Sequence, residues 1–187
     1  MITMQQITEQ FSSATSRKTM WNESVEELIT QLAAPKGTVG ILYTSEDLAP
    51  FLGKMLDQLR LKTGVTDWAG ASGYGTISHT EEIFGESSAT VIVLDLPPDA
   101  YRVFSGNADV GTLLSAKETE WLAEATMPLA ISHVDPRHTG AMDAISNLVE
   151  TTGSFLIGGL TAASSDSPHL VNDQKTCISG IAVSPMK

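Results

Sequence analysis

The chain has 187 residues and a mass of 19.9 kDa, a size typical of one domain. Hydrophobic residues make up 42% of the sequence and the mean hydropathy is +0.03, so the composition predicts a globular protein rather than a disordered or membrane-embedded one. The net charge of −11 repels phosphate groups, which argues against nucleic acid and anionic membrane surfaces as partners.

The N-terminal sequence and the cysteine content favour a cytoplasmic location. The first residues lack the apolar run of a signal peptide, and no stretch approaches the roughly 20 apolar residues that span a bilayer. The single cysteine, Cys177, allows no internal disulfide and no multi-cysteine metal or redox motif. It lies in an alternating apolar stretch, so we interpret it as a core residue rather than a nucleophile.

The first elements are a helix, a strand and a second helix. Apolar residues recur at helical spacing over 19–33, and a β-branched run predicts a buried strand at 38–43. Thr44 or Ser45 is expected to cap the second helix. Pro50 must lie in the opening turn of that helix, or the helix starts later.

The middle of the chain is rich in strands. Residues 65–78 predict two short strands around a glycine-rich bend, and 89–96 is the strongest strand in the sequence. Residues 101–104 are compatible with a further strand. Ser115 and Glu118 then form the pattern of a capping box, which opens a short helix.

The C-terminal part is predicted to contain a strand at 128–132 and a helix that ends at Gly153. Asp135 and Pro136 have the residue types of an N-cap and a first helical position, so we expect the helix to begin there. Two more strands are predicted at 154–159 and 176–184.

These elements amount to about four helices and seven to nine short strands, without a repeat at a fixed period. Helix and strand do not alternate strictly, because 65–104 and 154–184 are rich in strands. We therefore predict an α+β fold in which a mixed, largely antiparallel sheet packs with the helices. Residues 1–18 are expected to form an N-terminal arm and residues 19–187 a single domain.

The segment Gly70–Gly75 has three glycines in six residues, which let the backbone come close to a bound group. Its spacing fits neither a phosphate-binding loop nor a nucleophile elbow. A second glycine pair, Gly158–Gly159, follows an apolar strand and precedes Thr161. Each loop is explained either as a turn or as part of a ligand pocket.

We predict that the two glycine loops converge on one small-ligand pocket, because both lie next to strands expected in the same sheet. Their backbone N–H groups and hydroxyls supply hydrogen bonds to the ligand. The residues predicted to bind it are Gly70, Ser72, Gly73, Tyr74, Gly75, Gly158, Gly159 and Thr161.

His133, Asp135 and His138 have residue types that ligate zinc or iron. A strand end, a helix cap and a first-turn position explain the same residues. A single haem-ligating histidine has no spacing by which to recognise it. We therefore expect no metal and no cofactor, and nominate no catalytic residue.

Three segments carry a further signal. They are TVGILYTSEDLAPFLGKMLDQL leading to WAGASGYGTIS, the isolated strand ATVIVLDL, and LAISHVDPRHTGAMDAISNLVETTGSFLIGGLTAASSD followed by CISGIAVS. In order and spacing they resemble the FIST N-terminal domain, a family of predicted sensory modules in signal-transduction proteins, over roughly residues 20–185. Family members often carry a Gly-Cys pair where this chain has Gly70-Ala71, so no thiol chemistry is carried over.

The resemblance implies an intracellular sensor that binds an amino acid or a similar small metabolite, and it favours a binding module over an enzyme. Its implied partner is a FIST C-terminal domain, which is missing after Lys187, or another signalling protein. A sheet built to meet a second domain leaves an apolar edge or face uncovered. Two copies of the chain can cover this surface by pairing with each other, so we expect a homodimer. The alternatives are a hydrolase or transferase that uses Ser72 or the group of His133, Asp135 and His138, and a protein-interaction module.

Overall fold

The computed structural model describes residues 11–33, 35–106, 113–162 and 178–184. In this part of the chain it has ten strands and four α-helices, and five of the seven strand pairs are antiparallel. The predicted α+β class with mixed, largely antiparallel pairing is confirmed. The strands are divided between two four-stranded sheets and one hairpin, whereas the sequence had indicated one sheet.

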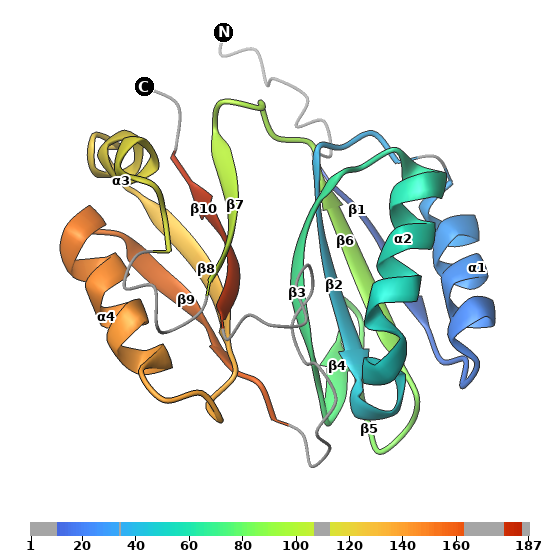
Figure 1. The fold of residues 1–187 in the computed structure, drawn as a ribbon. Coiled ribbons are helices and arrows are strands. Elements are labelled where there is room, and N and C mark those ends of the chain that lie inside the picture. The colour runs from blue at the N-terminus through green and yellow to red at the C-terminus, as the bar shows by residue number, and fades with distance from the viewer. Residues whose placement is uncertain (1–10, 34, 107–112, 163–177, 185–187) are drawn as a thin grey trace, which may run out of the picture.

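The first sheet has the order β1-β6-β2-β3, in which β2 and β3 are parallel and the other pairs antiparallel. Helices α1 and α2 cover its outer face and bury Leu28 and Leu59 against Trp68 and its neighbours (Figure 1). The elements are β1 (Phe11–Ser16), α1 (Trp21–Leu32), β2 (Val39–Ser45), α2 (Leu52–Thr63), β3 (Asp67–Gly73) and β6 (Ala89–Leu94). Strand β1 lies within the segment that we had assigned to an N-terminal arm.

The second sheet has the order β7-β10-β8-β9, in which β8 and β9 are parallel and the other pairs antiparallel. Helices α3 and α4 cover its outer face and bury Leu122 and Leu148. The elements are β7 (Tyr101–Gly106), α3 (Ala116–Ala123), β8 (Leu129–Val134), α4 (Ala141–Thr152), β9 (Phe155–Leu160) and β10 (Ile178–Val183).

The two sheets pack against each other through their inner faces. Val39, Ile41 and Ala69 of the first sheet meet Tyr101 and Ile181 of the second in one buried cluster. The molecule therefore has four layers, with a helix pair outside each of the two sheets (Figure 1). Each sheet is apolar on both faces at its centre, because one face meets helices and the other meets a sheet.

The second half of the chain repeats the first. Apart from a two-stranded hairpin at residues 75–84 in the first half, each half runs strand, helix, strand, helix, strand, strand, with the same pairing order and the same strand directions. The matched registers make Tyr43 equivalent to His133 and Gly70 equivalent to Gly158. These pairs are separated by 90 and 88 residues. Few side chains are identical at equivalent positions, so this repeat is not recognisable as a fixed period in the sequence.

Two helices begin later than predicted. Pro50 lies in a 3-10 turn, Glu46–Phe51, and α2 starts only at Leu52, which was the stated alternative. The expected N-cap at Asp135 is wrong, because α4 begins at Ala141. The Asp135 carboxylate instead accepts hydrogen bonds from the backbone N–H of Arg137, at 3.0 Å, and from its Nε, at 2.9 Å. These bonds hold a turn in place of the expected first helical turn.

Three further expectations concern the start of α3, the position of Cys177 and membrane-spanning helices. The capping box is confirmed, since Ser115 accepts a hydrogen bond from the Glu118 N–H and the Glu118 carboxylate accepts one from the Ser115 N–H. Cys177 lies outside the described residues. In the ranges that are described, no helix is both long and apolar enough to cross a membrane.

Strand β9 is an edge strand with exposed apolar side chains, and we therefore retain the prediction of a homodimer at micromolar concentration. Phe155 is 71% exposed and Ile157 43% exposed on the inner side of this strand. Sedimentation equilibrium should report a dimer for the parent protein and a monomer for Phe155→Glu. A carboxylate at this position makes burial of the β9 edge in a dimer interface unfavourable. A parent protein that sediments as a monomer up to tens of micromolar would contradict the prediction.

Candidate functional site

The carboxyl ends of both parallel strand pairs lie at one end of the molecule (Figure 1). A pocket of about 350 Å³ opens there, between the ends of β2 and β3 and the ends of β8 and β9. Ligands of α/β proteins bind preferentially outside the carboxyl ends of parallel strands, and this volume lies in the range of small-molecule sites. The lining residues are Tyr43, Ala71, Ser72, Gly73, Gly75, Thr76, Ile77, His133, Gly158, Gly159, Leu160, Thr161 and Ala162.

The structure brings both glycine loops to this pocket. Six of the eight residues nominated from the sequence line it: Ser72, Gly73, Gly75, Gly158, Gly159 and Thr161. Gly70 and Tyr74 do not. Gly70 lies inside β3, and Tyr74 is half exposed and borders a separate acidic depression with Glu46 and Asp47.

Gly70 and Gly158 have a structural role that is the same in both halves. Their φ angles are +139° and +137°, which L side chains rarely adopt. A Cβ on Gly70 would lie 1.9 Å from the carbonyl oxygen of Leu42, and one on Gly158 would lie 1.8 Å from that of Ser132. These two glycines therefore let β3 and β9 approach β2 and β8 just before the pocket.

Gly159 differs from its neighbour. A Cβ on Gly159 would meet no atom within 4 Å, and its φ lies outside the positive range. In the register of the second sheet Gly159 stands beside His133, so its missing side chain leaves open space on the pocket side of β9.

Tyr43 and His133 form the polar floor of the pocket. The Tyr43 hydroxyl lies 2.7 Å from Nε2 of His133, and the two rings meet edge to face with centroids 5.2 Å apart. Each residue comes from the equivalent position of its half, so the contact joins the two halves through equivalent side chains. Tyr43 was not among the residues nominated from the sequence. His133 was considered as a metal ligand, as a strand-end residue and as part of an alternative catalytic group with Asp135 and His138.

This pair is electrically neutral at pH 7. Burial lowers the pKa of His133 to about 4, against a smaller opposing effect of the Ser179 backbone. Among the described residues, Nδ1 of His133 has no hydrogen-bond partner of normal geometry. Burial also raises the pKa of the Tyr43 hydroxyl. The described lining residues include no Asp, Glu, Lys or Arg.

The group considered for metal binding is not assembled around the pocket. His133 points to Tyr43, whereas Asp135 is paired with Arg137 and His138 is exposed. Burial would raise the pKa of Asp135, but the hydrogen bonds from Arg137 outweigh it and the pKa is lowered. Within the described ranges, no cluster of three or more His, Cys, Asp or Glu side chains could hold a metal ion.

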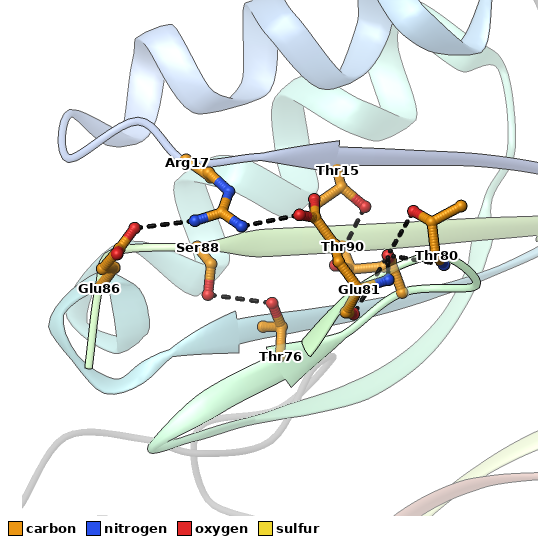
Figure 2. A network of polar contacts seen from close by, with 9 residues as sticks. Thr15, Arg17, Thr76, Thr80, Glu81, Glu86, Ser88 and Thr90 are labelled. Carbon is orange, nitrogen blue, oxygen red and sulfur yellow. Dashed lines mark hydrogen bonds and ion pairs between the residues drawn. The ribbon is translucent and has the colours of Figure 1, made fainter. Parts of the chain in front are cut away.

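One wall of the pocket is a hairpin of β4 (Gly75–Ile77) and β5 (Glu82–Phe84). Figure 2 shows the polar contacts that link it to Arg17, just after β1, and to Ser88, just before β6. Thr76 Oγ1 donates a buried hydrogen bond of 3.0 Å to Ser88 Oγ. The Arg17 guanidinium pairs with Glu81 at 2.7 Å and with Glu86 at 2.9 Å, on the exposed side. The buried bond positions Thr76, and with it the adjacent Ile77, at the pocket.

Comparison with known families identifies the same region. The FIST N domain matches residues 38–185, which include both halves of the pocket and all of its lining residues. The resemblance inferred from the sequence is confirmed over this range. No curated protein matches the chain.

Proposed function

Because the chain belongs to the FIST N domain family, whose members are predicted sensory signalling domains, we propose that it is a sensor module that binds a small ligand in the pocket between its two halves. The observation that carries the proposal is the composition of the pocket, in which equivalent strand ends from both halves meet around Tyr43 and His133. A concave site of this size with a few polar groups is typical of small-molecule binding.

The position of the pocket supports a sensory role. A ligand that contacts both β3 and β9 interacts with two layers of the molecule at once, so it favours the arrangement in which both sets of contacts are made. A signalling partner that binds one of these arrangements more tightly responds to the change in their relative populations. By family association, that partner is a FIST C-terminal domain or another signalling protein.

The expected amino-acid ligand fits this pocket only in part. Backbone N–H groups of the glycine loops suit a carboxylate, and Ser72 and Thr161 also line the pocket. An ammonium group needs an acidic side chain, and the described lining residues provide none. The pocket is therefore better suited to a small metabolite without an ammonium group than to a zwitterionic amino acid.

Gly159→Val tests the proposed site. The added side chain enters open space, so it should fill the pocket while leaving thermal stability close to that of the parent. We expect native mass spectrometry of freshly purified protein to show a co-purified small molecule in the parent and none in Gly159→Val. Gly159→Ala, which fills less of the pocket, should retain part of it.

Thermal unfolding of each variant is the control for loss of structure. If Gly159→Val remains folded and keeps the same bound mass as the parent, the ligand lies elsewhere and the proposed site is wrong.

A further inference from the structure

We propose that the ligand of this pocket is a compact, uncharged molecule that combines a hydrogen-bonding group of the carboxamide type with an apolar part. This rests on the proposed function, since it specifies what the sensor pocket binds. The proposal is carried by the charge, the hydrogen-bonding groups and the apolar rim of the described lining residues.

The absence of a charged side chain from the described lining is the first argument. Moving a charged group out of water is costly unless a partner of opposite charge replaces its hydration. Among the described lining residues His133 is the one titratable base, and it stays neutral at physiological pH because it is buried. A ligand carboxylate or ammonium would thus lose hydration without gaining an ion pair.

The field of the whole chain acts in the same direction for anions. The net charge of −11 repels them from the surface before they reach the pocket. A cation is attracted by that field, but it finds no carboxylate among the described lining residues. An uncharged ligand meets neither obstacle.

The polar floor suits a group that both donates and accepts. When the Tyr43 hydroxyl donates to His133 Nε2, its oxygen can still accept a hydrogen bond from a ligand N–H. Among the described strands β9 lies at the edge of its sheet, so its outward N–H groups have no strand partner within the described residues and can meet a ligand carbonyl. A carboxamide has both an N–H and a carbonyl.

The rim of the pocket is apolar. Ile77 of the hairpin is 71% exposed and Leu160 of β9 is 57% exposed, and both line the pocket. An apolar ligand group placed between them removes apolar surface of both side chains from water. Because the cavity is about 350 Å³, near the lower end of small-molecule sites, the ligand is compact.

A matched set of fluorinated probes tests the ligand class. The probes are 4-fluorobenzamide, 4-fluorobenzoate, 4-fluorobenzylamine and 4-fluorophenylalanine, which share a ring and differ in charge. In fluorine NMR titrations at pH 7, the amide should bind at least about 10-fold more tightly than each charged probe. Gly159→Val should abolish its binding, and Tyr43→Phe should weaken it by about 3- to 10-fold, the effect of one lost hydrogen bond.

Each outcome has a defined meaning. If a charged probe binds as tightly as the amide and Gly159→Val abolishes its binding, the ligand class is wrong but the pocket remains the binding site. If no probe binds, or if Gly159→Val leaves amide binding unchanged, the inference is overturned. The proposed function is then judged separately by whether the co-purified mass is lost in Gly159→Val.

Discussion

Gly158→Ala is expected to destabilise the folded protein by about 3 kcal/mol or more, whereas Gly159→Ala should change stability by less than about 0.5 kcal/mol. Alanine at 158 must adopt a φ near +137° and brings its Cβ within 1.8 Å of the Ser132 carbonyl oxygen. That oxygen belongs to the adjacent strand and cannot move without disturbing the β8–β9 pairing. Alanine at 159 meets no atom within 4 Å.

Urea unfolding followed by circular dichroism measures both variants. The equivalent change in the first half, Gly70→Ala, is the matched comparison, because its Cβ would lie 1.9 Å from the Leu42 carbonyl oxygen. Gly70 and Gly158 should respond alike, although one lines the pocket and the other does not. Equal stabilities of Gly158→Ala and Gly159→Ala would show that this backbone geometry is not required.

Local pattern predicted most elements correctly, since period and capping depend on neighbouring residues. The strand predicted at 89–96 corresponds to β6, which ends at Leu94, and Ser115 and Glu118 form the predicted cap of α3. The predicted start of α4 was wrong because the hydrogen bonds between Asp135 and Arg137 close a separate turn, and residue types alone do not show whether such a turn continues into the helix.

Pairing between distant strands could not be read from the same pattern. β6 lies between β1 and β2, although most of the first half separates it from β1 in sequence. An apolar run predicts a buried strand but does not specify its neighbours, so a division into two stacked sheets is equally compatible with it. The number of sheets was therefore beyond the sequence reasoning.

The glycine loops of the candidate site were predicted from the sequence, whereas the contact of Tyr43 with His133 at its polar floor was not. Glycine pairs next to strands are a local signal, and it led to both loops that line the pocket. Tyr43 and His133 meet only because two halves of equal topology face each other. An alignment of the two halves on Gly70 and Gly158 places Tyr43 and His133 at equivalent strand ends. This equivalence is the sequence signal from which both residues could have been predicted.

Acid is expected to weaken the fold through His133. Its pKa is about 4 in the folded protein, compared with 6.5 for an unperturbed histidine, because burial disfavours the imidazolium ion. Above pH 6.5 both the folded and unfolded states hold it neutral. As the pH falls below 6.5 the unfolded state gains a proton that the folded state does not, so the free energy of unfolding decreases, and the decrease is complete near pH 4. The full loss is about 3 kcal/mol, and about 2 kcal/mol of it should be present at pH 5.

His133→Gln separates this effect from the titration of surface carboxylates. Glutamine can still hydrogen-bond to the Tyr43 hydroxyl but does not titrate. The difference in unfolding free energy between the parent and His133→Gln should therefore shift by about 2 kcal/mol, against the parent, between pH 7 and pH 5. An NMR titration of the His133 imidazole gives the independent check, because its resonances should not move above pH 5. If they titrate near pH 6.5, or if both proteins have the same pH dependence, the imidazole is not held neutral against Tyr43, and the neutral floor on which the ligand class depends is lost.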